Sequence, residues 1–320
     1  MTEEIVVLRS AIRPYLEKCE AGDCVIVAVS GGADSLALSY ALFKEVAPLA
    51  LRLVAVTIDH QLQKISSLQA EKVSAQLRGI GYEEVIIRKV TVTSEAGMEA
   101  GARSARYGAL DEICNDLHAR QIYLGHTRDD QAESVLLGLV RGSGTRSLSG
   151  MADRNGKYIR PFLAITREQT VAACVEVALV PWLDPHNQDP IYTRVRVRNE
   201  AIPFLEEKLG PGISAALARS AALFRADADA LDEIAARAMA AMDLANLDIE
   251  ALAAMSRAIR SRIIRSAIYA AGAPIGSISA DHVAAIEALI TLWRGQGEVS
   301  LPGGVKVWRI SGRLCLLART

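Results

Sequence analysis

The hexapeptide Ser30-Gly31-Gly32-Ala33-Asp34-Ser35 constrains this chain more than any other stretch. An apolar, β-branched run over Cys24–Val29 precedes it and is typical of a buried parallel strand. An apolar-periodic stretch that starts at Leu36 follows it and predicts a helix. A strand, a glycine turn and a helix together present backbone N–H groups and a helix N-terminus to an anion. The glycines also let the backbone approach a ligand closely, so we expect a phosphate site here.

Asp34 distinguishes this turn from an ordinary helix start. A carboxylate inside a phosphate-binding turn repels the phosphate unless a cation lies between them, so Asp34 predicts a Mg²⁺ ligand. Ser30 and Ser35 add hydroxyl donors. The alternative, a strand-to-helix turn capped by Asp or Ser, is disfavoured by the complete hexapeptide. No Gly-Lys-Ser/Thr follows, which excludes a Walker A loop, and the lack of GxGxxG disfavours a dinucleotide.

The remainder of the first half alternates between apolar runs and helical periodicity. This alternation predicts a doubly wound parallel α/β sheet. Ligands bind beyond the carboxyl ends of the strands in such sheets, and the candidate motifs at 30–35, 57–60 and 125–130 all follow predicted strands. After a lead-in helix over 5–19, the further predicted strands cover 51–58, 84–90 and 121–124, and the predicted helices cover 67–77, 98–117 and 129–140.

In the second half of the chain, the strand signal fades and helical patterns predominate. Helices are predicted over 166–177 and 194–209, and the sequence after Gly210 is alanine-rich and helical with a break at 244–247. A helix over 279–293 precedes a tail over 298–317 that is typical of β-hairpins. We therefore predict a catalytic domain over residues 1–210 and a smaller, mostly helical domain over 211–320 that ends in β-hairpins.

Composition limits the class of protein. The 320 residues suffice for two domains, and a net charge of −1 excludes a broadly basic nucleic-acid binder but allows a local basic groove. The five cysteines include no Cys-x-x-Cys pair, which disfavours a zinc or dithiol site and is typical of a reducing compartment. The N-terminus is not leader-like and no apolar run has membrane-spanning length. We expect a cytoplasmic protein with no membrane partner.

A second candidate site begins at a predicted strand end, where the sequence reads Gly125-His126-Thr127-Arg128-Asp129-Asp130. His126 and Asp130 are four residues apart, so one helical face presents both. Acidic residues in a first helical turn commonly offset the helix dipole, and a single histidine is commonly a packed residue. The combination of Gly-His at a strand end with Asp-Asp-Gln favours a functional site.

Arginines are concentrated near these motifs. Arg103 and Arg106 lie one turn apart, and two interpretations stay open: a solvated basic face, or guanidinium groups that clamp a phosphate or carboxylate. Each remaining cluster alone is more typical of a solvated surface, but together they suggest contacts to RNA phosphates. The clusters are Arg141, Arg146, Arg154, Lys157, Arg160 and Arg167; Arg194, Arg196 and Arg198; and Arg257, Arg260, Arg262 and Arg265.

The hexapeptide resembles the pyrophosphate-binding loop of the PP-loop ATP pyrophosphatase superfamily. The stretch GHTRDDQAESVLLGLVRGSGTRSLSGM at 125–151 is similar to the DDQAET-type helix, RGSG and GM-containing loop of the tRNA(Ile)-lysidine synthetase family. Arg160-Pro161 and Pro181-Trp182 are further matches, and the similarity covers about residues 20–210. The sequence departs from the family at Thr127, where His or Asn is frequent, and at Ser134 and Val195. Longer members carry a further C-terminal domain, and only the first appended domain is expected here.

The resemblance implies an enzyme that ligates free L-lysine to the 2-carbon of the wobble cytidine in tRNA(Ile) with a CAU anticodon. The cofactors implied are ATP and Mg²⁺. The cytidine is first adenylated with release of pyrophosphate, and lysine then displaces AMP. A homodimer is compatible with the sequence, which does not fix the oligomeric state.

The resemblance also implies residue roles, which we state as expectations. The loop Ser30, Gly31, Gly32, Ala33, Asp34 and Ser35 holds pyrophosphate, with Asp34 on the metal. Backbone at Thr57 and Ile58 reads adenine, and Gly125 lies against the nucleotide. Arg106 and His126 stabilise the α-phosphate transition state. Asp130 orients His126, binds metal or takes a proton from the lysine ammonium. The residues expected to bind the tRNA substrate are Arg103, Arg141, Arg194, Arg196 and Arg198.

Three alternatives belong to other classes. A PP-loop tRNA thiolase would need a cysteine pair near the site, and the sequence has no such pair. A PP-loop amidotransferase would need a glutaminase domain or partner, and no catalytic Cys-His set is visible. A non-catalytic ATP- and tRNA-binding module would release no pyrophosphate.

Overall fold

The computed structural model describes residues 3–61, 66–92, 98–142, 144–185 and 188–318. The chain forms two compact units, Met1–Gly142 with Ser149–Ala221, and Ser143–Leu148 with Ala222–Thr320. Each unit has a hydrophobic core of its own. The sequence placed the domain boundary at Gly210, whereas the two units divide between Ala221 and Ala222, inside helix α10 (Ile213–Met239).

The first unit is built on a six-stranded sheet of order β3-β2-β1-β4-β6-β5. Every neighbouring pair is parallel except β5 with β6. β1 pairs with β2 from Cys24↔Arg52 to Ala28↔Val56 and with β4 as far as Ala28↔Leu124. The strands are β1 (Cys24–Ala28), β2 (Arg52–Asp59), β3 (Glu84–Lys89), β4 (Gln121–Leu124), β5 (Arg154–Asn155) and β6 (Tyr158–Ile159).

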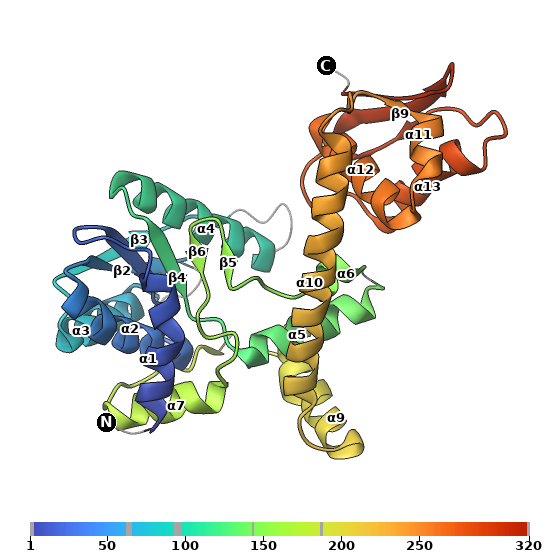
Figure 1. Ribbon diagram of the computed structural model, residues 1–320. Coiled ribbons are helices and arrows are strands. Elements are labelled where there is room, and N and C mark those ends of the chain that lie inside the picture. Colours follow the sequence, from blue (N-terminus) through green and yellow to red (C-terminus); the bar gives the residue numbers. More distant parts are fainter. Residues whose placement is uncertain (1–2, 62–65, 93–97, 143, 186–187, 319–320) are drawn as a thin grey trace. The chain divides into compact units, whose positions relative to one another are not determined.

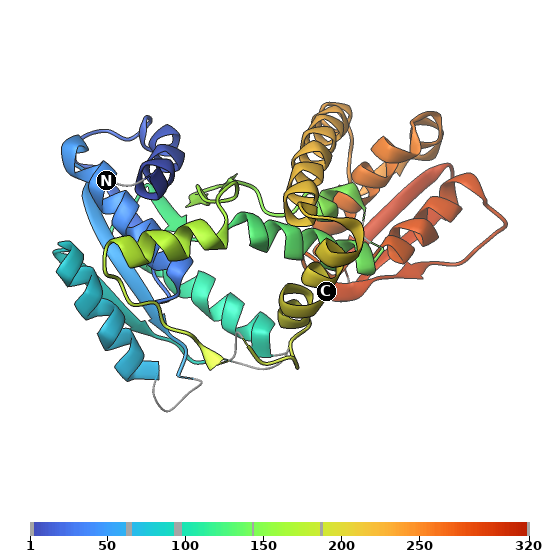
Figure 2. The same cartoon turned by 90° about the horizontal axis from the view of Figure 1, so that it is seen from below.

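Helices cover both faces of this sheet, and Figure 1 shows α4 on one side and α2 with α3 on the other. One apolar cluster joins α2 and α3 to β1 through Leu38 and Val73, and α7 lies beside α2 in Figures 1 and 2. A second cluster packs Leu110 and Ile113 of α4 against Ile26 of β1. Burial on both faces explains the continuous apolar run of β1. The helices are α1 (Glu3–Leu16), α2 (Ala33–Val46), α3 (Ser66–Ile80), α4 (Met98–Asp116), α5 (Arg128–Val140), α7 (Arg167–Glu176), α8 (Thr193–Arg196) and α9 (Ile202–Leu209).

The strand order places the functional loops together. From β1 the chain runs outward through β2 to β3 and then returns to place β4 on the other side of β1. The loops that follow β1 and β4 therefore leave the same edge of the sheet at the point where the order reverses, which is where open α/β sheets bind ligands. The predicted doubly wound parallel sheet is confirmed.

The second unit contains a four-stranded antiparallel sheet of order β7-β10-β9-β8 that shares a core with its helices. The predicted terminal hairpin is confirmed in β9 and β10, which pair from Val305↔Ala318 to Ile310↔Arg313. The break expected at 244–247 leads into strand β7, which was missed because three residues show no alternation and its partner β10 is distant in the sequence. The elements are α6 (Thr145–Leu148), β7 (Asn246–Asp248), α11 (Ile249–Ala254), α12 (Arg257–Ala270), α13 (Ala280–Thr291), β8 (Val299–Ser300), β9 (Val305–Ile310) and β10 (Arg313–Ala318).

Several helices differ from the sequence prediction, and α1 ends at Leu16, where the prediction continued it to residue 19. α3 continues through Gly79 to Ile80, where the prediction ended it at Leu77. The helix predicted over 194–209 is divided into α8, a π-helical turn over Val197–Ala201 and α9. A π-turn has no periodicity signal of its own and often accompanies functional sites. No helix within the described ranges combines the length and the apolarity needed to cross a bilayer.

Leu38 provides a test of the first core. Its side chain is fully buried in α2, whereas that of Leu68 in α3 is 53% exposed. We expect Leu38→Ala to lower the free energy of unfolding by about 2–5 kcal/mol, through lost burial and the cavity left behind. Leu68→Ala, the matched control, should change it by about 0.5 kcal/mol or less. Urea unfolding followed by tryptophan fluorescence measures both, and equal losses would contradict the described packing.

Candidate active site

The glycine loop between β1 and α2 has a backbone geometry that requires glycine at Gly31. Gly31 has φ +90°, and a Cβ at this position would lie 2.6 Å from Cγ2 of Val73. Gly32 is the N-cap of α2. Within the described residues the N–H groups of Gly31 and Gly32 have no hydrogen-bond acceptor, and the first N–H groups of a helix lack intrahelical partners. The loop therefore offers a row of donors to an anion.

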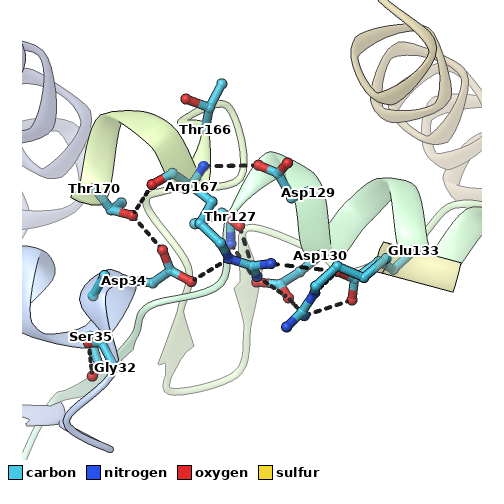
Figure 3. Close-up of polar contacts among 12 residues, drawn as sticks. Gly32, Asp34, Ser35, Thr127, Asp129, Asp130, Glu133, Thr166, Arg167 and Thr170 are labelled. Carbon is cyan, nitrogen blue, oxygen red and sulfur yellow. Dashed lines mark hydrogen bonds and ion pairs between the residues drawn. The ribbon is translucent and has the colours of Figure 1, made fainter. Parts of the chain in front are cut away.

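The two serines of the loop stabilise it through hydrogen bonds within the loop. The Ser30 N–H donates to Oγ of Ser35 over 3.2 Å. The Ser35 hydroxyl donates to the Gly32 carbonyl over 2.9 Å, a contact that Figure 3 shows. The two hydroxyl oxygens are 3.2 Å apart. Ser35 thus uses its proton within the loop, and its expected contact with pyrophosphate stays a prediction.

Asp34 lies in the first turn of α2 and faces α7. Thr170 Oγ1 donates to its Oδ1 over 2.5 Å, and Arg167 Nε donates to its Oδ2 over 3.4 Å. Burial raises the pKa of the Asp34 carboxyl, and the nearby Arg167 only partly offsets that effect. α7 begins where the sequence predicted, because Thr166 accepts the Gln169 N–H as its N-cap. The packing of α7 against α2 then brings Arg167 and Thr170 to Asp34.

A second group of charges surrounds the start of α5. Figure 3 shows Arg167 between Asp34 and Asp130. Asp130 Oδ2 accepts the Thr127 N–H over 2.9 Å, and its Oδ1 lies 3.3 Å from Arg167 Nη2. Burial acts to raise the pKa of Asp130, but Arg167 and Arg194 outweigh it and lower the pKa below the ordinary value. Asp130 is therefore ionised at neutral pH.

Glu133 lies one turn further along α5 and is 1% exposed. It accepts hydrogen bonds from Arg194 Nε and Arg198 Nε, each over 2.6 Å. Both arginines also approach Asp130 Oδ1, at 3.5 and 3.4 Å. Arg194 and Arg198 thus belong to a network around two buried carboxylates, and their expected binding of tRNA stays a prediction.

His126 and Arg106 form the more positive part of the site. Burial lowers the pKa of His126 and Asp130 raises it, while Arg106 and Arg160 lower it further, so the imidazole is neutral at physiological pH. Its Nδ1 is buried with no hydrogen-bond partner among the described residues. Burial likewise lowers the pKa of Arg106, whose guanidinium lies 5.5 Å from the centre of the Tyr107 ring. No hydrogen bond joins His126 to Asp130 in the described structure.

A cavity opens beside the glycine loop at the ends of β1 and β2. Thr57 and Ile58, expected to read adenine, both line it. The Trp182 N–H donates to the Gly31 carbonyl over 2.8 Å, which fixes the 180s loop on the glycine loop. Further lining residues are Ser30, Asp59, His60, Ser66, Gln69, Ala70, Val73, Trp182 and Asp184. The cavity is suited in position to a nucleoside whose phosphates reach the loop.

The structure brings together most of the predicted site residues, but not all. Ser30 to Ser35, Thr57, Ile58, Gly125, His126 and Asp130 lie at one sheet edge. Arg141 is exposed at the C-terminus of α5, and Arg196 is exposed and donates to the Pro190 and Ile191 carbonyls. Glu133 and Thr170 were not named as site residues, and Arg167 was named only within a basic cluster. The capping signal at Thr166 placed α7 but did not show that it packs on Asp34.

The donor set around Asp34 is compatible with Mg²⁺. Such ions are commonly held by one or two carboxylates together with substrate phosphates rather than by a cage of protein ligands. Asp34 provides one carboxylate beside the donor row of the loop, and no cluster of three or more His, Cys, Asp or Glu suited to a metal occurs among the described residues. The Arg167 guanidinium provides positive charge at the same carboxylate.

The third arginine cluster lies on α12 in the second unit. Its side chains form ion pairs and hydrogen bonds with residues of the same unit. Arg257 and Arg260 pair with Glu287 at 3.0 and 3.5 Å, and Arg262 pairs with Asp232 at 2.6 Å. Arg265 donates to the Ile278 carbonyl. These contacts stabilise the unit, and a role in RNA binding stays a prediction.

Comparisons with known proteins match these features. A model described as "PP-loop domain" matches residues 7–205, and one described as "TilS substrate binding domain" matches residues 247–315. The chain is 48% identical to a tRNA(Ile)-lysidine synthase from Thermobifida fusca, over 98% of each chain. It is 50% identical to a tRNA(Ile)-lysidine synthase from Streptomyces coelicolor, over 91% of this chain and 84% of that one.

One solved structure supports the fold. The U34-tRNA thiolase NcsA from Methanococcus maripaludis with its 4Fe-4S cluster aligns with a TM-score of 0.57 and 17% identity, over 69% of this chain and 80% of that one. At that identity the likeness concerns the fold alone.

Gly125 provides a test of the site's geometry. A Cβ there would lie 2.9 Å from the carbonyl carbon and oxygen of Asp34 and 3.0 Å from Cα of Ser35. We expect Gly125→Ala to push β4 and the loop apart and to weaken binding of α,β-methylene-ATP at least tenfold. Gly108→Ala is the matched control, because a Cβ at Gly108 in α4 meets nothing within 4 Å. Titration calorimetry measures both, and unchanged affinity in Gly125→Ala would contradict the close approach.

Proposed function

Because the chain belongs to the tRNA(Ile)-lysidine synthase family, we propose that it joins free L-lysine to the 2-carbon of the wobble cytidine of tRNA(Ile) with a CAU anticodon. Family membership makes the protein an ATP-using enzyme of tRNA modification. The finer assignments, a carbon–nitrogen ligase that uses Mg²⁺ and acts in the cytoplasm, belong to the proposal. The observation that carries it is the meeting of the glycine loop, Asp34, His126 and Asp130 at one sheet edge beside the cavity at Thr57.

The first half-reaction activates the cytidine. Its 2-carbonyl oxygen attacks the α-phosphate of ATP, an O–P bond forms, and the bond to pyrophosphate breaks. The free N–H groups of Gly31 and Gly32 and the N-terminus of α2 stabilise the charge that accumulates on the departing pyrophosphate. When bound, Mg²⁺ would offset phosphate charge, and Asp34 is the residue that would hold it.

The α-phosphate gains negative charge in the transition state. We propose that Arg106 and His126 stabilise it. The guanidinium supplies a permanent charge, and the neutral imidazole supplies one N–H without bringing a second buried charge. Donors fixed before the reaction are worth more at such partly buried positions than in water.

The second half-reaction needs lysine as a free amine. The amine attacks the 2-carbon of the adenylated cytidine, a C–N bond forms, and AMP leaves. We propose that the ionised Asp130 carboxylate holds the lysine ammonium beside His126 and accepts its proton as attack proceeds. The lowered pKa of Asp130 makes it a better anchor for an ammonium than a strong base, so anchoring is the larger part of its role. We also propose that the second domain contacts the tRNA.

The rival functions find less support. A thiolase needs sulfur-bearing groups at the reacting base, and no cysteine lines the cavity within the described residues. A binding module would explain the ATP cavity but not the charged residues gathered at the start of α5.

The central test is a transfer assay. We expect the protein with ATP, Mg²⁺ and labelled L-lysine to label a CAU-anticodon tRNA(Ile) transcript and no CAU-anticodon tRNA(Met) transcript. Pyrophosphate release without label transfer would indicate another PP-loop enzyme. Absence of both would indicate a binding module.

Two substitutions separate the half-reactions. We expect Asp34→Asn to abolish tRNA-dependent ATP–pyrophosphate exchange, because the phosphate charge is then not offset. Asp130→Asn should lower lysine transfer at least a hundredfold and affect exchange less, because its carboxylate serves the second step. Thermal unfolding checks that both variants are folded. Full lysine transfer by Asp130→Asn, or retained exchange by Asp34→Asn, would falsify the respective role.

A further inference from the structure

Arg160 is a buried charge with no carboxylate partner among the described residues. It directly follows β6 and is 5% exposed. Its Nη1 donates to the Ala152 carbonyl over 3.0 Å and its Nη2 to the Tyr107 hydroxyl over 3.3 Å, while its Nε has no partner in the described chain. A buried cation without an anionic partner destabilises the folded protein, because the desolvation of its charge is not compensated. Stability alone does not explain this residue.

Two arginines lie within hydrogen-bond distance of the Tyr107 hydroxyl. Arg103 Nη2 lies 3.4 Å from it and Arg160 Nη2 lies 3.3 Å from it, and each guanidinium can only donate. A phenolic oxygen accepts about two hydrogen bonds, so this one is left with its own proton to offer. Burial acts to raise the pKa of Tyr107, but Arg103, Arg160 and Arg106 outweigh it and lower the pKa, which makes the O–H a stronger donor.

The aromatic ring of Tyr107 also contacts two guanidinium groups. The guanidinium groups of Arg103 and Arg106 lie 4.9 and 5.5 Å from its centre. No ion pair joins Arg103, Arg106 or Arg160 to a carboxylate within the part of the chain that the structure describes. β6 pairs parallel to β4, so Arg160 leaves the sheet at the edge that carries His126. Three cations and a hydroxyl thus lie together at this edge without an anionic partner among the described residues.

We propose that Tyr107 is a further substrate-binding residue whose hydroxyl donates to a phosphate oxygen, and that Arg160 is the positioning residue that directs it. The proposal rests on the proposed function for the origin of the phosphate. That phosphate belongs either to ATP or to the RNA backbone next to the reacting nucleotide. Both offer the same singly bonded, negatively charged oxygen, so the chemistry of recognition is shared.

The test uses the full chain and two ligands measured separately: α,β-methylene-ATP with Mg²⁺, and a CAU-anticodon tRNA(Ile) transcript. Tyr107→Phe keeps the ring that Arg103 and Arg106 contact and removes only the hydroxyl. We expect its Kd for one of the two ligands to rise about tenfold or more, as for a lost hydrogen bond to a charged group. A rise for the nucleotide identifies an ATP phosphate, and a rise for the transcript identifies an RNA phosphate.

Tyr158→Phe is the matched control. Its ring packs on that of Tyr107 with 4.9 Å between centres, but its hydroxyl donates to Asp111 Oδ1 over 2.7 Å. We expect both Kd values to stay within about twofold of wild type. Equal losses in Tyr107→Phe and Tyr158→Phe would overturn the proposal, because they would indicate ring packing as the cause.

Arg160→Met separates positioning from a structural role. If Arg160 acts through Tyr107, this variant weakens the same ligand, and the double variant with Tyr107→Phe is no weaker than Tyr107→Phe alone. Removal of an uncompensated buried charge should leave the melting temperature equal or higher. A lower melting temperature with both Kd values unchanged would overturn the proposal. The binding measurements do not depend on lysine transfer, so failure of the proposed function would leave them interpretable.

Discussion

The site depends on the close approach of two strand ends. β1 and β4 are neighbours in the sheet, and Gly125 after β4 lies so close to the backbone of Asp34 and Ser35 that no Cβ fits between them. This contact brings the glycine loop and the start of α5 to one edge. Side chains from α4 and α7 then converge on that edge, so residues far apart in the sequence meet there.

The charged residues of the site form two groups. In one group arginines are paired with carboxylates, and in the other they contact neutral groups. Around Glu133 and Asp130, carboxylates and arginines are paired at short distances, so this part is held in place before any ligand arrives. Around Tyr107 the arginines have neutral partners within the described residues. A polyanion would gain most from the second group, because no ion pair joins its arginines to a carboxylate within the described residues, while the first group would provide rigid support.

Local signals in the sequence predicted a large part of this arrangement. The Ser30–Ser35 turn, the apolar β1 run and the Thr166 cap depend on neighbours in the chain, and each has the predicted local structure. Contacts between distant elements were not predictable in this way. The packing of Arg167 and Thr170 on Asp34 depends on how α7 docks against α2, and the pairing of Arg194 with Glu133 depends on where the chain returns after the 180s loop. Strand β7 illustrates the same limit, because its partner β10 is distant in the sequence.

Arg167 is shared by the carboxylates to which we assign the two half-reactions, since it contacts Asp34 through Nε and Asp130 through Nη2. One guanidinium cannot neutralise both fully. A cation that binds at Asp34 would therefore compete with Arg167 for that carboxylate, and a cation at Asp130 would compete with it there. By thermodynamic reciprocity, each event changes the free energy of the other by the same amount. On the proposed roles, nucleotide and amino-acid binding would therefore be coupled through the Arg167 side chain.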